Sequence, residues 1–303
     1  MEIRHLRYFL AVAREENMTR AAGLLHVTQP TLSKALQALE EELGKKLILR
    51  RSCSIRLTQE GVLLRDRAEA LISMADKIQR EFLSLDDVTG GELSFGLAES
   101  FQIRYLAREL RRLKERCPGL RYHITSGDTE QVTEQLDKGL LDFAVVCSTP
   151  DGDKYRFLEF PEADRFGLIV PCTHSLAGCE TVSPEDLAGL PLFCSEQSWE
   201  ADIRPWAGKD FSRLRMEGSF RLAFNGALFT REGLGFLLTL EHLVDVSPGS
   251  GLTFVPLLPE LRLRFYLIWN RYQTFTPIAG RFLEQMTEAF SGCRQDPPQA
   301  AAF

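Results

Sequence analysis

The stretch RAAGLLHVTQPTLSKALQALEEELGKKL, residues 20–47, decides the fold of the first part of this 303-residue chain. It is typical of two short helices joined by a turn that contains a threonine, a glutamine and a proline. Thr28 is placed to cap the second helix, and Pro30 falls in its first turn, where a missing backbone N–H costs nothing. One side of this helix carries apolar residues at the spacing of a buried face, namely Leu32, Ala35, Leu36 and Leu39.

Another amphipathic helix precedes this pair. Leu6, Phe9, Leu10 and Ala13 recur at the spacing of one helical face. We expect Thr19 to cap the helix that follows it. The sequence therefore predicts three short helices packed on one another at the N-terminus.

The side of the third helix opposite its apolar face is polar. Its amide, hydroxyl and ammonium groups are those that read base edges and phosphates when a helix lies in the major groove of DNA. Backbone N–H groups at the start of the helix, near Gln29, favour a phosphate. We expect the DNA-facing side to consist of Gln29, Pro30, Thr31, Ser33, Lys34 and Gln37.

A basic hairpin is predicted directly after these helices. The run KKLILRRSCSIRLT, residues 45–58, alternates apolar residues around a basic and polar tip, which is typical of a β-hairpin wing. Arg50, Arg51 and Arg56 would be available there to the DNA backbone or the minor groove. An ordinary three-helix bundle with a solvated polar face has the same periodicity, but the Thr-Gln-Pro turn and this hairpin favour DNA binding.

The charge distribution agrees with a DNA-binding head. Residues 1–57 hold ten basic and six acidic residues, a net charge of +4, whereas the remainder holds 26 basic and 36 acidic residues, a net charge of −10. Only the head is then suited to a polyanion. Hydrophobic residues make up 44% of the chain, yet no run approaches the roughly 18 apolar residues of a membrane span. The N-terminus lacks the pattern of a secretory signal, so we expect a cytoplasmic protein.

A long helix follows the hairpin and carries a regular apolar seam. The steps alternate between four and three residues, as in a coiled coil, and such a seam predicts a partner helix. A homodimer or homotetramer would place two recognition helices on one palindromic site. A long helix packed on its own domain is the alternative. The seam consists of Leu64, Ala68, Leu71, Ala75, Ile78, Phe82 and Leu85.

The run HLRYFLAVAREENMTRAAGLLHVTQPTLSKALQALEEELGKKL, followed by RLTQEG, closely resembles the N-terminal winged helix-turn-helix of LysR-type transcriptional regulators over residues 3–61. Matched residue by residue, the family's DNA-facing positions fall on Gln29, Pro30, Thr31, Ser33 and Lys34, with the wing at residues 50–56. The resemblance implies a transcription regulator that binds double-stranded DNA and a small-molecule effector and contacts RNA polymerase. We expect a DNA-binding domain over 1–58, a linker helix over 59–89 and an effector-binding domain over 90–303.

The remainder of the chain is predicted to be α/β. Short apolar runs alternate with helical patterns from residue 91 onward, which indicates mostly parallel sheets covered on both faces. A break near residues 159–164 and a return strand at 264–269 predict two lobes, one of about 90–161 and 268–303 and one of about 162–267. The runs LDKGLLDFAVV and REGLGFLL resemble landmarks of the family's effector domain, which implies a two-lobed plan similar to periplasmic binding proteins.

Effectors in such folds bind beyond the carboxyl ends of the strands. We expect hydroxyl and apolar side chains from these ends to line a cleft between the lobes. Three acids beside them, Glu99, Asp128 and Glu196, would disfavour a strongly anionic effector if they point inward. The expected effector residues are Ser100, Phe101, Ser126, Thr129, Cys147, Ser195, Phe224 and Phe229.

Other function classes find less support. The chain has no GxSxG elbow, phosphate-binding loop, HExxH motif or complete dinucleotide fingerprint, so we expect neither an enzyme nor a cofactor or metal site. A cytosolic solute-binding protein would share the two-lobed fold but would have no use for a basic head. A thiol redox-sensing regulator is the remaining alternative, because Cys172, Cys179 and Cys194 fall in one lobe. The seven cysteines are scattered, which is typical of reduced thiols.

Overall fold

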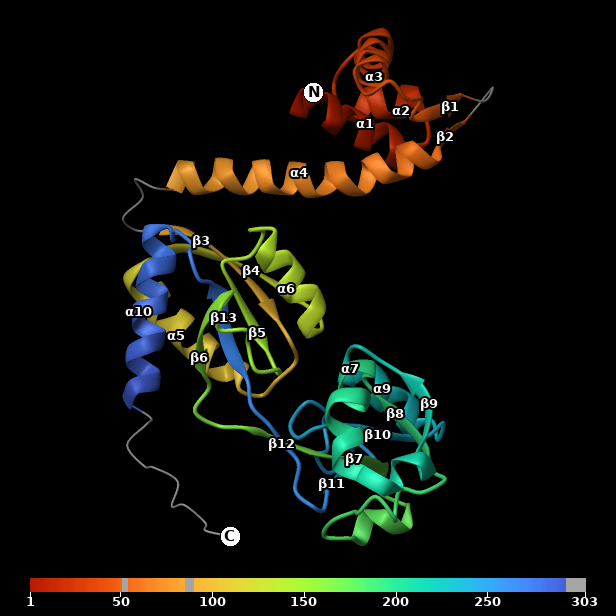
Figure 1. The fold of residues 1–303 in the computed structure, drawn as a ribbon, viewed down its shortest axis with the longest axis vertical. Helices are drawn as coiled ribbons and strands as arrows, with labels where there is room; N and C mark the ends of the chain where they lie inside the picture. Colours follow the sequence, from red (N-terminus) through yellow and green to blue (C-terminus); the bar gives the residue numbers. More distant parts are fainter. Residues whose placement is uncertain (51–53, 85–89, 293–303) are drawn as a thin grey trace. The chain divides into compact units, whose positions relative to one another are not determined.

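The structure is a computed structural model that describes residues 1–50, 54–84 and 90–292 (Figure 1). Backbone contacts divide the chain into two units, Met1–Leu83 and Ser84–Phe303. The first unit contains the predicted helices and hairpin, and the second contains the α/β part. Each unit is described by itself.

Three short helices, a two-stranded hairpin and one long helix form the first unit. Asn17, rather than the expected Thr19, caps α2, because its side-chain oxygen accepts hydrogen bonds from the backbone N–H groups of Thr19 and Arg20 at 2.9 and 3.0 Å. Thr28 caps α3 as expected, with Pro30 in the first turn. The elements are α1 (Ile3–Glu15), α2 (Met18–Leu24), α3 (Gln29–Leu43), β1 (Ile48–Arg50), β2 (Ile55–Leu57) and α4 (Gln59–Ser84).

The apolar faces of α1, α2 and α3 meet in one core. Phe9 of α1 and Leu32 and Leu39 of α3 are completely buried, and the small Ala21 of α2 lets the helices approach closely. Burying aliphatic and aromatic side chains of this size contributes about 1.5–3 kcal/mol each. The predicted buried face of α3 is therefore confirmed.

The hairpin is tied to the helices at both of its strands. Ile48 pairs with Leu57 in the antiparallel ladder, and the N–H of Ile55 donates to the carbonyl of Glu16 at 2.9 Å. The hydroxyl of Thr58 accepts from the N–H of Gly61 at 2.9 Å and so caps α4. A side chain at Gly61 would lie 2.1 Å from the carbonyl oxygen of Leu47, which makes glycine necessary at this junction.

The apolar seam of α4 divides into two parts. Ala68 is completely buried, and it packs with Leu64 on the core of its own unit, so these two residues need no partner chain. Further along, Ile78 and Phe82 are 47% and 69% exposed. Leu71 is exposed as well, Ala75 is half-buried, and Leu85 lies outside the described residues.

In the second unit, the first lobe is a five-stranded sheet in the order β4-β3-β5-β13-β6. Helix α6 covers one face, and α5 and α10 cover the other (Figure 1). Phe282 of α10 stands edge-on to Phe95 of β3 at 5.2 Å, which joins the end of the chain to the sheet. The elements are β3 (Gly90–Leu97), α5 (Ile103–Arg116), β4 (Gly119–Ser126), α6 (Thr129–Asp137), β5 (Phe143–Val146), β6 (Tyr155–Glu159), β13 (Tyr266–Asn270) and α10 (Pro277–Gly292).

The second lobe is a sheet in the order β11-β7-β10-β8-β9, with β12 paired to β7. Leu237 of β10 packs with Ala227 of α9 on one face, while Leu238 packs with Ile203 on the other. The elements are β7 (Asp164–Pro171), η1 (Ser175–Gly178), β8 (Pro191–Cys194), α7 (Glu196–Ser198), η2 (Trp199–Ile203), α8 (Arg204–Ala207), η3 (Gly208–Arg213), β9 (Arg215–Ser219), α9 (Ala223–Arg231), β10 (Phe236–Leu240), β11 (Leu252–Pro256) and β12 (Arg262–Leu263).

The chain crosses between the lobes twice. It leaves the first lobe after β6 and returns in β13 (Tyr266–Asn270), which overlaps the return strand expected at 264–269. In each sheet, one strand runs antiparallel to its neighbours and the other strands are parallel to one another. The antiparallel strand is β13 in the first lobe and β7 in the second. No helix in the described part of the chain is long and apolar enough to span a bilayer.

Candidate functional site

The exposed side of α3 is the first candidate site. Gln29, Pro30, Thr31, Lys34 and Gln37 are exposed, and Ser33 is half-buried. The structure therefore brings the predicted DNA-facing residues together on one face. The hydroxyls of Thr28 and Thr31 lie 2.8 Å apart, and the amide of Gln37 donates to Glu41 at 2.8 Å. These bonds order the polar face before any nucleic acid arrives, which lowers the entropy lost on binding.

The predicted basic wing is described only in part. Arg50 lies in β1 and pairs through its backbone with Ile55. Arg56 of β2 is exposed and stands opposite Leu49. Arg51 lies outside the described residues.

Glu40 holds the wing against α3, a role that sequence reasoning missed. Its buried carboxylate accepts from the N–H groups of Leu47 and Ile48 at 2.8 and 3.3 Å and from the ammonium of Lys46 at 2.7 Å. Burial by itself raises the pKa of Glu40, but these bonds to the charged form together outweigh it and leave the pKa lowered. The carboxylate therefore connects the recognition helix to the hairpin that follows it.

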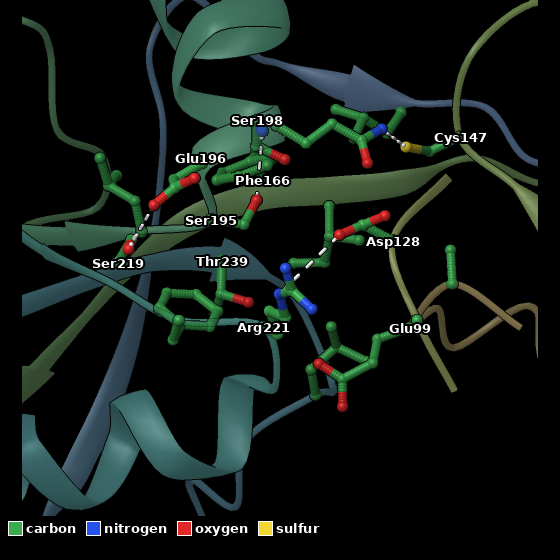
Figure 2. Close-up of a pocket in the computed structure, with 18 of the residues that line it drawn as sticks. Glu99, Asp128, Cys147, Phe166, Ser195, Glu196, Ser198, Ser219, Arg221 and Thr239 are labelled. Atoms are coloured by element: carbon green, nitrogen blue, oxygen red, sulfur yellow. Dashed lines mark hydrogen bonds and ion pairs between the residues drawn. The ribbon is translucent and has the colours of Figure 1, made fainter. Parts of the chain in front are cut away.

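The second candidate site is a cavity of about 400 Å³ between the two lobes (Figure 2). It lies where the strands of both sheets end. Ala98 follows β3 and Cys147 follows β5 in the first lobe, while Ser195 follows β8 and Phe220 follows β9 in the second. This agrees with the expectation that ligands bind beyond the carboxyl ends of parallel strands.

One part of the cavity wall is apolar. The crossover strand β7 contributes Phe166, and the segment returning to the first lobe contributes Leu263 and Phe265. Strand β10 adds Leu238 and Leu240. A hydrocarbon or aromatic group placed here would be removed from water, at about 25 cal/mol per Å² of apolar surface.

The other part of the wall is polar and carries more negative than positive charge. Glu99, Asp128 and Glu196 all line the cavity, so the acids noted in the sequence do point inward (Figure 2). Among the described residues, Arg221 is the one basic residue that lines the cavity, and its guanidinium lies 3.9 Å from the carboxylate of Asp128. Hydroxyl groups surround these charges, contributed by Ser195, Ser198, Ser219 and Thr239.

Polar bonds join the two lobes at the cavity. Gln197 of the second lobe donates to the sulfur of Cys147 at 2.9 Å and to the hydroxyl of Thr129 at 3.0 Å. Glu99 of the first lobe accepts from the N–H of Ala223, the first residue of α9, at 2.8 Å. Burial raises the pKa of the Glu99 carboxyl and that of the Cys147 thiol. An effector in the cavity would touch groups that hold the lobes together.

Several expected effector residues lie elsewhere. Among the eight, only Cys147 and Ser195 line the cavity. Ser100 is buried and donates to Asp164 at 2.6 Å, so its hydroxyl holds the start of β7. The ring of Phe101 packs at a tilt against that of His242, with ring centroids 4.5 Å apart. Ser126 is exposed at the end of β4, and Thr129 bonds to Gln197 next to the cavity.

The two expected aromatic wall residues are also misplaced. Phe224 and Phe229 of α9 are 66% and 53% exposed, and neither lines the cavity. The apolar wall comes instead from the crossover segments, with Phe166, Leu263 and Phe265, and from β10, with Leu238 and Leu240. Residues 219–221 lie at the end of β9, where the same strand-end rule that selected Ser195 could have identified them.

The cysteines give little support to a thiol switch. Cys194 is buried, and burial strongly raises the pKa of its thiol, which disfavours the reactive thiolate. Cys172 and Cys179 are exposed free thiols. Cys53 and Cys293 lie outside the described residues.

Comparison with known proteins assigns each unit of the chain to a known domain family. The family profile described as a bacterial regulatory helix-turn-helix protein of the lysR family matches residues 3–62, and that of the LysR substrate binding domain matches residues 86–291. The DNA-binding transcriptional dual regulator OxyR of Escherichia coli (strain K12) is 31% identical over 297 residues, 95% of this chain and 94% of OxyR. The HTH-type transcriptional regulator AlsR of Bacillus subtilis (strain 168) is 28% identical over 260 residues, 84% of this chain and 80% of AlsR.

Solved structures show the same fold. The crystal structure of CbnR, a LysR family transcriptional regulator, gives a TM-score of 0.74 at 22% identity and covers 95% of this chain and 99% of that one. A second structure, of full-length CbnR complexed with its target DNA, gives a TM-score of 0.75 at the same identity and covers 95% of this chain and 100% of that one. With the helix-turn-helix profile on its first unit, the substrate-binding profile on its second and a 31% identical relative along 95% of its length, the chain belongs to the LysR family of DNA-binding transcription regulators.

Proposed function

We propose that two copies of this chain read an inverted repeat in double-stranded DNA and that a small molecule in the interlobe cavity changes how the two heads engage it. The observation that carries the DNA-reading part is the division of α3 into two sides. One side is polar and exposed, and the opposite side is apolar and buried. A contact with RNA polymerase follows from the family resemblance and stays a prediction.

Base reading is assigned to Gln29. Its exposed amide lies at the start of α3 and can form paired hydrogen bonds with adenine. Lys34, five residues further along α3 and also exposed, and Arg56 on the wing carry positive charges suited to phosphates. The site thus separates a group that distinguishes bases from groups that attract any duplex.

The effector part is supported by the cavity and its position. The lining residues come from both lobes and from the segments that cross between them. A ligand that binds one arrangement of the lobes better than another shifts the population toward that arrangement. The ligand can change the equilibrium between the two arrangements only by as much as its affinities for them differ.

The first test is selection of fragments from randomised duplex DNA by the purified full chain, followed by binding measurements on the recovered site. We expect an inverted repeat. Gln29→Ala should weaken binding to the recovered site by about 1–3 kcal/mol and relax the preference at one base pair in each half. Arg56→Ala should weaken specific and random DNA alike and reduce the salt dependence by about one phosphate contact.

A matched control is Gln79→Ala, which removes an exposed glutamine from α4 instead of α3. It should leave base preference unchanged. Equal losses on selected and random DNA for Gln29→Ala and Arg56→Ala would contradict the assignment of Gln29 to base reading.

A thiol redox sensor of the same architecture is the second candidate. Several relatives, including one from Dickeya chrysanthemi that is 32% identical over 269 residues, are named hydrogen peroxide-inducible genes activators. The burial of Cys194 argues against carrying that role over to this chain. We therefore favour control by a bound effector.

A further inference from the structure

We infer that the effector of this regulator is a small cation with an apolar body, such as a primary amine on an aromatic or branched hydrocarbon, bound with its charged group toward Glu99. This inference rests on the proposed function, because it assigns a chemical class to the ligand of the interlobe cavity. The site itself is defined by the cavity and by the match to the substrate-binding domain. The acids decide only which charge it accepts.

The balance of charge is the first argument. Three carboxylates, Glu99, Asp128 and Glu196, face one guanidinium, that of Arg221. Arg221 already lies 3.9 Å from Asp128, and its side chain is 71% exposed, so much of its charge is screened. An entering carboxylate would meet more like charge than opposite charge, whereas an ammonium would meet the reverse.

The second argument is that a backbone N–H group suited to bind an anionic ligand already donates to Glu99. The first N–H of a helix favours negative charge, and in the nine-residue α9, which begins two residues after the cavity-lining Arg221, that group belongs to Ala223. Glu99 reaches across from the other lobe and accepts that bond at 2.8 Å. A carboxylate ligand could gain this N–H only by displacing Glu99 into the same small cavity.

The Glu99 carboxylate can accept further hydrogen bonds, which favours a ligand that carries hydrogen-bond donors. Only one hydrogen bond to its carboxylate is found among the described residues, and no described cation pairs with it. A carboxylate offers about four lone-pair sites, so most of them remain for a ligand. An ammonium group has three donors and no acceptor, which matches the carboxylate of Glu99 and the hydroxyls of Ser195 and Thr239 that line the same cavity.

The apolar wall sets the rest of the ligand. Phe166, Leu263 and Phe265 form a surface suited to a ring or a branched chain, and the cavity of about 400 Å³ holds one small molecule. Arginine-like ligands without an apolar part would leave this surface unused. The same three residues belong to the segments that cross between the lobes, so burying them couples ligand binding to lobe geometry.

The test uses three probes that share a phenyl ring and a two-carbon chain: phenethylamine, phenethyl alcohol and hydrocinnamate. Their affinities for the full chain are measured by isothermal titration calorimetry at neutral pH. We expect phenethylamine to bind on the order of 10-fold or more tightly than hydrocinnamate, with the alcohol between them. Glu99→Gln, which keeps an acceptor for the Ala223 N–H, should abolish the preference for the amine.

Glu200→Gln is the matched control. Glu200 is exposed, pairs with Arg204 at 2.7 Å and does not line the cavity, so this variant should keep the preference. Tighter binding of hydrocinnamate, or an amine preference that survives Glu99→Gln, would overturn the cationic class. So would a lack of binding by all three probes up to about 10 mM, near the weak limit for ligands of this size. Sequence-specific DNA binding by the same preparation reports separately on the proposed function.

Discussion

Gly61 shows how one residue without a side chain can decide a junction. It lies where the wing ends and α4 begins, and its Cα faces the carbonyl oxygen of Leu47. A backbone atom cannot move aside as the end of a flexible side chain can. The glycine in the RLTQEG motif therefore has a packing reason that does not involve DNA.

Gly61→Ala should destabilise the protein by about 1–3 kcal/mol, because its new methyl group would overlap the Leu47 carbonyl and force the wing away from α4. Gly23→Ala is the control, since nothing lies within 4 Å of the added atom there. That change lies inside α2 and should stabilise the helix by up to about 1 kcal/mol. Chemical denaturation of both variants measures the difference, and equal stability would contradict the steric explanation.

Glu99 illustrates a residue kept at some expense of stability. Burial raises the pKa of its carboxyl above the usual 4.5. At a pH between the usual pKa and the raised pKa, the folded protein therefore binds more protons than the unfolded chain. Stability should then fall as the pH rises through this window. The charged groups of Asp128, Glu196 and Arg221 line the same cavity as Glu99, and the N–H of Ala223 donates to its carboxylate.

We expect Glu99→Gln to be more stable than the wild type at about pH 7 and the gain to vanish below about pH 4, where the glutamic acid is also neutral. Thermal melting across this range tests the expectation. Replacing the Glu99 side chain would then stabilise the fold while it weakens binding of the cationic ligand. A loss of stability at neutral pH would instead assign Glu99 a structural role.

At the scale of elements, α4 serves two purposes along its 26 residues. Its first half completes the core of the head through Leu64 and Ala68. From Leu71 onward it exposes apolar residues of the predicted seam, namely Leu71, Ile78 and Phe82. Exposed apolar side chains at coiled-coil spacing are suited to a second copy of the same helix.

Ile78→Asp combined with Phe82→Asp should therefore disrupt the proposed association of two copies and give smaller species without unfolding the head. Analytical ultracentrifugation measures the change. Leu63→Asp is a control, because Leu63 is exposed on α4 but lies off the seam. If the seam does not mediate association, the double variant and the control will sediment alike.

At the scale of the whole molecule, the second unit links a ligand cavity to the path of the chain. β7 and β13 carry the chain between the lobes, and Asp164 at the start of β7 binds Ser100, Phe101 and Gln102 of the first lobe. Phe166 of the cavity wall lies only two residues after Asp164, so a change at Phe166 acts close to these bonds. A ligand-dependent change in lobe geometry has a short route to the first lobe.

The thiols are expected to have no part in this response. Cys172→Ser, Cys179→Ser and Cys194→Ser, introduced together, should leave DNA binding and its response to ligand unchanged in the presence or absence of hydrogen peroxide. Cys194 is too deeply buried to ionise readily, and the other two lie near η1, away from the cavity lining. A peroxide response that the triple variant loses would restore the redox-sensing interpretation.

The sequence by itself determined the parts that depend on local periodicity and chemistry. The buried face of α3, its Thr28 cap and the exposed polar residues opposite follow from a 3.6-residue repeat, and the structure has them where expected. Strand ends were identifiable as well, which is why Ser195 and the three acids were found. The cap of α2 was misassigned because Asn17 and Thr19 are both good capping residues.

Only the tertiary structure decided which strand-end residues meet. Ser100 was expected in the cleft but faces Asp164, which is 64 positions away in sequence, and Phe224 and Phe229 lie outside the cavity although helix periodicity allowed them inside. Phe166, Leu263 and Phe265 form the wall because the crossover segments bring them between the lobes. Local sequence patterns carry the direction of a side chain relative to its own helix or strand, whereas its neighbours depend on how distant segments pack, and that packing sets the charge and shape of the cavity.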